Sequence, residues 1–422
     1  MSRSLLLVTP LLVVASAIAA PRPATVGAPG KAAQDSCTAC HARLDDRRLQ
    51  VPARASSDDI HHRQGVSCAG CHGGDPTSGD AAVAMDPARG FVGRIESGQE
   101  PARCGSCHSD AAFMTRYGAN IPTDQESQYR TSRHGQGLAK GDRNVATCSS
   151  CHGAHGVLPA NDPRSAVYAS RVVDTCGRCH GNVALMTGYG LKGDELAQYR
   201  QSVHYAALTT KNDLSAPTCN DCHGSHGAAP PGIESVSNVC GTCHLTQRER
   251  FDLSPHKDAF AAIEQPACEA CHGNHAVIEP NDGWIGVGEG QVCGSCHSVG
   301  DAGAEAAGGL SSALAGASHA ILATSRRVDA ARRAGMLMEE AEVRLEEAQQ
   351  ALVLARNEIH TVTLARMSEQ TQAVGRATAG ADQLAAAAEA EIRFRRTGLF
   401  VSLGVILLAM LALALKIRAL ER

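Results

Sequence analysis

The cysteines and histidines of this 422-residue chain share one repeated pattern. All 18 cysteines fall in nine Cys-x-x-Cys pairs, and a histidine directly follows each pair. The nine motifs are Cys37-Cys40-His41, Cys68-Cys71-His72, Cys104-Cys107-His108, Cys148-Cys151-His152, Cys176-Cys179-His180, Cys219-Cys222-His223, Cys240-Cys243-His244, Cys268-Cys271-His272 and Cys293-Cys296-His297. Because the chain has only 19 histidines, their recurrence in one position indicates a single shared chemistry.

That chemistry is the covalent attachment of c-type haem. Two thiols at this spacing can add to the two vinyl groups of one porphyrin, and the next histidine then supplies the proximal imidazole to the iron. Structural zinc fits less well, because zinc takes four ligands, usually from two such motifs, and nine motifs do not pair. Disulfides across a two-residue gap are reactive rather than structural. The sequence therefore predicts about nine haem c groups, with 18 thioether cysteines and nine proximal histidines.

With these motifs, residues 37–297 resemble the multihaem c-type cytochromes of the low-potential, bis-histidine type. The resemblance implies export from the cytoplasm, covalent haem attachment outside it, and electron transfer along closely packed haems.

An internal repeat groups the motifs in pairs. A Ser-x-His element precedes the first motif of each pair, and Gly-x-His follows that motif. In a divergent first copy, two adjacent histidines precede the motif and Asp75 replaces the histidine that follows it. The sequence therefore predicts one leading haem and four two-haem modules.

The remaining histidines nearly match the number of second axial ligands that nine irons need. The predicted distal ligands are His61, His62, His134, His155, His204, His226, His256, His275 and His319. His61 and His62 are both included because, in the small tetrahaem cytochromes of the resembled type, neighbouring histidines can serve two haems. Methionines are the alternative at some positions, namely Met85, Met114 and Met186. His360 is left out because it lies on the flank of a helical heptad pattern.

The fold class that follows is mainly helical and irregular. Aromatic residues make up only 3% of the chain, so an ordinary core is not available and the porphyrins are expected to serve as the core. We expect short helices at the motifs, Gly- and Pro-rich loops between them, and little or no sheet.

Composition also divides the chain into segments. Residues 1–19 read as a signal peptide, with Arg3 before an apolar run and Ala19 at the cleavage site; an uncleaved anchor is the alternative. The predicted segments that follow are a nonahaem domain at 20–300, a helical, coiled-coil-like stalk at 310–396, a transmembrane helix at 397–416 and a cytoplasmic tail at 417–422.

The stalk carries a heptad seam of alternating small and large residues. It comprises Ala334, Met338, Ala341, Leu345, Ala348, Leu352, Ala355, Ile359 and Val362. We expect one helix over 318–371, breaks at Gly375 and Gly380, and a second helix from Ala381 into the apolar stretch. The partner of the seam could be this second helix folded back, the haem domain or a second copy of the chain.

Two main functions compete. The favoured one is a respiratory electron conduit on the outer side of the cytoplasmic (inner) membrane, in the periplasm or outside the cell. Its redox partners would be a quinol oxidoreductase or soluble donor, and a downstream cytochrome or reductase. The alternative is an oxidoreductase for a nitrogen or sulfur compound with one five-coordinate haem, at His41 or in the module with Asp75.

A third hypothesis, overlapping the first, is a haem-scaffolded anchor within a larger complex. A helix-mediated oligomer is also possible. A net charge of −4 argues against nucleic-acid binding.

Overall fold

The computed structural model describes residues 35–227 and 236–421, in two compact units, Met1–Val236 and Ser237–Arg422. All regular elements of the described residues are helices, with no strand among them, as the sequence predicts. The division between the units falls inside the predicted haem domain, so the last three motifs share a unit with the C-terminal helices. The predicted signal peptide, residues 1–19, lies outside the described residues.

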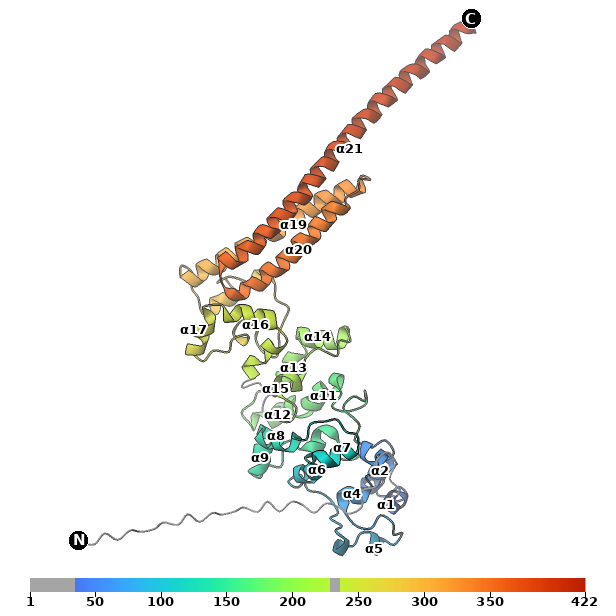
Figure 1. The fold of residues 1–422 in the computed structure, drawn as a ribbon, viewed down its shortest axis with the longest axis vertical. Coiled ribbons are helices and arrows are strands. Elements are labelled where there is room, and N and C mark those ends of the chain that lie inside the picture. Colours follow the sequence, from blue (N-terminus) through green and yellow to red (C-terminus); the bar gives the residue numbers. More distant parts are fainter. Residues whose placement is uncertain (1–34, 228–235, 422) are drawn as a thin grey trace, which may run out of the picture. The chain divides into compact units, whose positions relative to one another are not determined.

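Short helices joined by loops make up unit 1 (Figure 1). Its helices are α1 (Ser36–His41), α2 (Arg47–Ala55), α3 (Ile60–Arg63), α4 (Cys68–His72), α5 (Ala81–Ala84), η1 (Pro87–Arg89), α6 (Glu100–His108), α7 (Ala111–Arg116), α8 (Gln125–Thr131), α9 (Arg133–Ala139), α10 (Cys148–His152), α11 (Ala169–His180), α12 (Val183–Thr187), α13 (Glu195–Tyr199), α14 (Val203–Thr210) and α15 (Cys219–His223). Each of the six motifs in this unit lies at the C-terminal end of a helix, which confirms the prediction for these sites.

Local sequence explains where these motif helices begin and end. Thr147 and Thr218 form capping boxes at the start of α10 and α15, so their side chains satisfy amide groups of the first turn. After the motif histidine, Gly153 and Gly224 take positive φ angles of 81° and 82°, which glycine adopts readily and which end the helix. The Gly of the repeated Gly-x-His element is therefore a helix stop.

Unit 2 combines short elements with three long helices. These are η2 (Val236–Thr242), which begins at the last residue of unit 1, α16 (Leu245–Asp252), α17 (His256–Ala262), α18 (Glu269–His272), η3 (Asp282–Trp284), η4 (Val292–Ser295), α19 (Ala302–Arg333), α20 (Glu339–Glu358), η5 (Ile359–Thr361) and α21 (Leu364–Leu420). Helices α19, α20 and the first part of α21 run up, down and up as a three-helix bundle (Figure 1).

The bundle core follows the heptad spacing of each helix. Buried seam residues include Ala307, Leu310, Leu314, Ala317, Ile321 and Val328 on α19, Ala341, Leu345, Ala348, Leu352 and Ala355 on α20, and Met367, Val374, Ala381, Ala385 and Ala388 on α21. Arg327 on α19 also contacts Asp382 at 3.0 Å and Glu389 at 3.2 Å on α21. The predicted seam therefore exists, and its partners are the neighbouring helices of the same chain.

The predicted single helix over 318–371 is wrong. The chain turns back after Arg333, where Gly335 has a φ of 84°, and again after η5, where Val362 has a φ of 50°. Ala334, predicted on the seam, is exposed at the first turn. The expected breaks at Gly375 and Gly380 are also wrong, because α21 runs through both. A helical glycine costs about 1 kcal/mol, and the burial of adjacent seam residues outweighs that cost.

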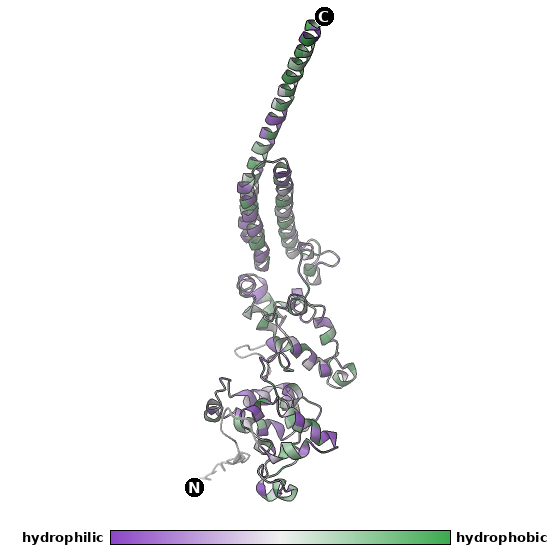
Figure 2. Ribbon diagram, turned by 90° about the vertical axis from the view of Figure 1, so that its right-hand side faces the viewer, coloured by the Kyte–Doolittle hydropathy of each residue, from purple (hydrophilic) through white to green (hydrophobic). Residues whose placement is uncertain are grey.

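Helix α21 continues past the bundle through the predicted transmembrane residues 397–416. Figure 2 shows the apolar character of this extension, and its leucines, valines and isoleucines are largely exposed. In the described part of the chain, α19 and α21 are the two helices long and apolar enough to cross a membrane. Helix α19, however, buries its seam in the bundle.

The bundle core yields a first prediction. Replacing Leu314, which is 0% exposed, by alanine is expected to lower the free energy of unfolding of the bundle by about 3 kcal/mol, because a cavity remains among the three helices. Leu322→Ala on the same helix is the control, since Leu322 is 51% exposed. Denaturant unfolding followed by helical circular dichroism measures both. Equal losses in the two variants would contradict the packing described.

Candidate functional site

Histidine rings face one another in pairs, and each pair joins a motif histidine to a histidine from elsewhere in the chain. Six pairs have ring centroids 5.9 to 6.2 Å apart. They are His72 with His155, His108 with His61, His152 with His226, His180 with His134, His297 with His256, and His272 with His360. Two pairs are nearly coplanar, with interplanar angles of 8° and 7° for His72–His155 and His152–His226.

This separation fits two axial ligands of one iron. A metal–imidazole bond is about 2 Å long, and a ring nitrogen lies about 1 Å from its centroid, so two imidazoles on opposite sides of a metal have centroids about 6 Å apart. Other aromatic pairs in proteins also have centroids 4.5–7 Å apart, so the argument rests on the recurrence of nearly the same separation at six motif histidines. The donor set is also suitable, since porphyrin supplies the other four ligands and only two side chains are needed.

The repeat explains how the chain brings these rings together. Ser132 caps α9 by accepting a hydrogen bond from the Gly135 amide at 3.0 Å, which puts His134 in the first turn of that helix. His134 faces His180, the second motif of its own module. The Gly-x-His histidines of the second and third modules, His155 and His226, instead face His72 and His152, the histidines of the first motif in the module before.

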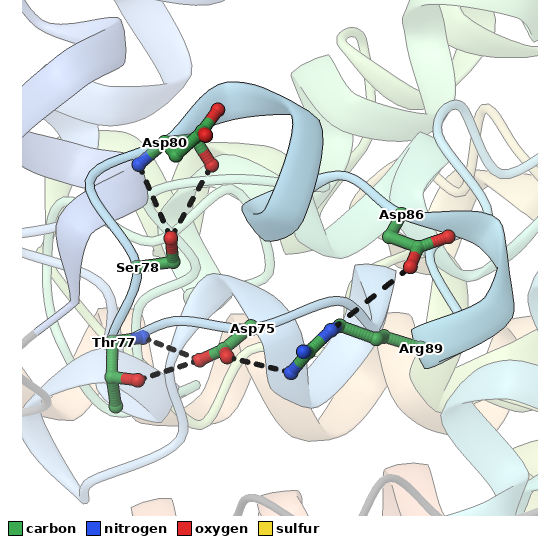
Figure 3. A network of polar contacts seen from close by, with 6 residues as sticks. All are labelled: Asp75, Thr77, Ser78, Asp80, Asp86 and Arg89. Carbon is green, nitrogen blue, oxygen red and sulfur yellow. Dashed lines mark hydrogen bonds and ion pairs between the residues drawn. The ribbon is translucent and has the colours of Figure 1, made fainter.

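Asp75 stands in the first copy of the repeat, where the later copies have the Gly-x-His histidine. The motif before this copy is the single Cys37-Cys40-His41. Asp75 instead accepts hydrogen bonds from the amide and hydroxyl of Thr77 at 3.0 and 2.7 Å, and from Nη1 of Arg89 at 2.9 Å (Figure 3). Arg89 also lies 4.0 Å from Asp86. Asp75 thus closes a surface loop.

Hydrogen bonds at Nδ1 orient several of the facing rings. Nδ1 of His72 lies 2.7 Å from the carbonyl oxygen of Gly93, and Nδ1 of His61 lies 3.1 Å from the Asp59 carboxylate. With Nδ1 as the donor, Nε2 keeps its lone pair, and this is the arrangement that histidine ligands of metals use.

Burial lowers the pKa of several of the facing imidazoles. Burial, together with neighbouring histidines that include His61, lowers the pKa of His108 to about 4. Burial and a facing ring also lower the pKa of His134, His155 and His256. A neutral imidazole is the form that binds iron, so these rings have the right protonation state at neutral pH.

The first cysteines of consecutive motifs contact each other. Thiol hydrogen bonds join Cys37 to Cys68, Cys104 to Cys148, Cys176 to Cys219, and Cys240 to Cys268. None of the 18 cysteines, all of which lie in the described residues, forms a disulfide.

Half-buried carboxylates hold two of these motif pairs together. The side chain of Asp35 accepts hydrogen bonds from the amides of Thr38 at 2.8 Å and Cys68 at 3.0 Å. Glu100 plays the same part between α6 and α10, accepting from the Thr147 hydroxyl and the Ser149 amide.

The second cysteine of some motifs also lies near a cysteine of the next motif. Burial raises the pKa of Cys71, and the nearby Cys107 raises it further. Cys151 has Cys179 as a neighbour in the same way, and Cys271 has Cys293 and Cys296. Within each unit, contacts between first cysteines therefore alternate with neighbouring second cysteines that influence each other electrostatically, in sequence order.

Not every predicted distal ligand is in the six pairs. His62 lies in α3, His204 in the first turn of α14, and His275 in the loop after α18. His319 lies on an exposed face of α19. His360, which the heptad pattern excluded, faces His272. The repeat could have indicated His360. No further module follows the last one, so no Gly-x-His histidine is left to face His272.

Among the described residues, no group of three or more His, Cys, Asp or Glu side chains could hold a bare metal ion. No protein-family model, curated protein or solved structure matches the chain.

Proposed function

We propose that the chain is a nine-haem c-type cytochrome that carries electrons and has no substrate of its own. The observation that carries this proposal is the set of six facing histidine pairs, each containing the histidine of a Cys-x-x-Cys-His motif. Two imidazoles per iron leave no open coordination position, so such centres are suited to electron transfer rather than to substrate binding.

The contacts between motifs support a conduit. Haem, when bound, supplies the one-electron chemistry, and the chain sets its position, ligation and surroundings. Thioether bonds would hold one porphyrin edge at each cysteine pair. The contact of Cys104 with Cys148 and the nearness of Cys151 to Cys179 would bring neighbouring edges together. Electrons would then pass along the motifs in sequence order within each unit.

The apolar extension of α21 supports a membrane location. Residues 397–416 would span the cytoplasmic membrane, with the haem motifs on its outer side and the last residues inside. The redox partners would be a quinol oxidoreductase or soluble donor, and a downstream cytochrome or reductase.

The competing enzyme hypothesis needs a five-coordinate iron. In the module with Asp75, both motif histidines face another ring: His72 faces His155 and His108 faces His61. This arrangement counts against a catalytic haem in that module and leaves His41 as the motif where the enzyme hypothesis is tested.

The deciding experiment measures haem number and spin state on the full chain after haem maturation. Intact mass should show nine covalent haems, the ferric protein should be low-spin throughout, and the reduced protein should not bind carbon monoxide. The control variant Cys148→Ser/Cys151→Ser should lose one haem. Colourless protein from a host with active maturation would contradict the proposal. One high-spin haem in nine would favour the enzyme.

A further inference from the structure

His360 lies in η5, the turn that joins two helices of the bundle, far along the chain from the motif at Cys268. Its ring centroid is nevertheless 6.2 Å from that of His272, with the planes 21° apart. This matches the separations of the five pairs that join a motif histidine to a predicted distal ligand.

The ring is oriented as an iron ligand would be. Nδ1 of His360 lies 3.1 Å from the carbonyl oxygen of Asn357 and donates to it. This bond within the turn fixes the tautomer and leaves the lone pair on Nε2. The same arrangement is seen for His72 and Gly93.

The turn that carries His360 is held in place by α16. Nε of Arg250 donates to the Glu358 carboxylate at 2.6 Å, and Nε2 of Gln247 donates to the Asn357 side chain at 2.9 Å. The fully buried Thr361 donates its hydroxyl to the Glu358 carbonyl at 2.7 Å. Contacts on both sides of His360 therefore restrain its position.

The opposite wall of the site is also tied to the bundle. Arg356 on α20 makes a two-bond ion pair with Asp282, with both distances 2.9 Å. Asp282 belongs to η3, whose Trp284 ring lies 6.0 Å from His272. The motif, η3 and the turn therefore surround one site.

We infer that His360 is the second axial ligand of the haem attached at Cys268 and Cys271, so the helical bundle supplies an iron ligand. This inference rests on the proposed function and deepens it. In the earlier modules, the following module supplies this ligand, as His155 does for His72 and His226 for His152. The last module has no successor, and the bundle takes its place.

The test compares His360→Ala with the matched control His319→Ala in the full, haem-loaded chain. Haem count should stay at nine in both. Electron paramagnetic resonance should show one ferric haem in nine changing from low to high spin in His360→Ala only. That haem should also bind carbon monoxide when reduced, and added imidazole should restore the low-spin signal.

A second variant covers the case in which His360→Ala does not fold. His360→Met should keep a sixth ligand, remain low-spin and raise the reduction potential of one haem, because Met/His ligation has a higher potential than bis-His ligation.

The outcomes separate this inference from the function on which it rests. Nine low-spin haems with unchanged potentials in the His360 variants would overturn it and leave the cytochrome intact. A high-spin haem in His319→Ala, with none in His360→Ala, would do the same. Wild-type protein without haem would overturn the proposed function itself.

Discussion

Without haem attachment, the chain is expected to keep its helical bundle and to lose the fold of unit 1. The described residues of unit 1 bury few apolar side chains, and most of these are isolated from one another. They are Ala53, Ala69, Phe113, Met114, Val172, Val173, Met186, Leu208 and Ala216. The cluster of Val173, Leu208 and Ala216 is too small to offset the conformational entropy of nearly two hundred residues.

The bundle differs because its core is made by side chains alone. Two clusters of buried residues run along α19, α20 and α21. A bundle that is stable by a few kcal/mol opens less than about 1% of the time, so its cleavage by protease is slowed correspondingly.

Limited proteolysis with mass spectrometry measures this difference. In protein made without haem maturation, sites in residues 35–227 should be cut at least about 100 times faster than sites in residues 302–389. The haem-loaded protein is the control and should resist cleavage in both regions. Equal protection of the two regions in the haem-free chain would show that unit 1 has a core of its own.

The second large effect concerns membrane retention. Ile406→Arg with Met410→Arg places two charges near the centre of the apolar extension of α21. Each costs about 2.5–3.5 kcal/mol at the centre of a spanning helix, so the pair is expected to abolish insertion. Membrane fractionation with alkaline extraction should find the wild type in the membrane and the double variant in the soluble fraction.

The matched control makes the same kind of double arginine substitution at exposed apolar residues outside the apolar extension of α21. Val353 and Leu354 are about as exposed as Ile406 and Met410, but they lie on α20. Val353→Arg with Leu354→Arg should therefore stay in the membrane fraction. Release of this control, or alkaline extraction of the wild type, would argue against the spanning assignment.

The parts of the fold that depend on short-range sequence were predictable. The motif helices of unit 1, the absence of strands among the described residues, the bundle seam and the apolar helix all follow from spacing within one or two turns. The turns of the bundle did not follow. Gly335 takes a φ of 84° in the turn after α19, whereas Gly375 stays helical inside α21. Buried residues flank Gly335 as well, namely Ala331 and Met338, so local pattern does not tell the two glycines apart.

The same reasoning explains His360. The heptad pattern places His360 on the flank of the seam only if one helix continues through that residue. The helix ends at Glu358 and a single 3₁₀ turn follows, so the ring is rotated away from the direction that the heptad predicts. The identity of its facing residue depends on tertiary packing. Pattern reasoning grouped the motifs, but it could not state which histidine faces which.

Because α21 is one continuous helix, its length sets the distance between the turn with His360 and the apolar stretch. From Leu364, beside the turn with His360, to the start of the apolar stretch at residue 398, the helix rises about 50 Å. On the proposed topology, the haem at Cys268 therefore stands far above the lipid. On that topology a hydrophobic carrier confined to the bilayer would not reach it, and a second protein would be needed to bridge that gap or receive the electrons there.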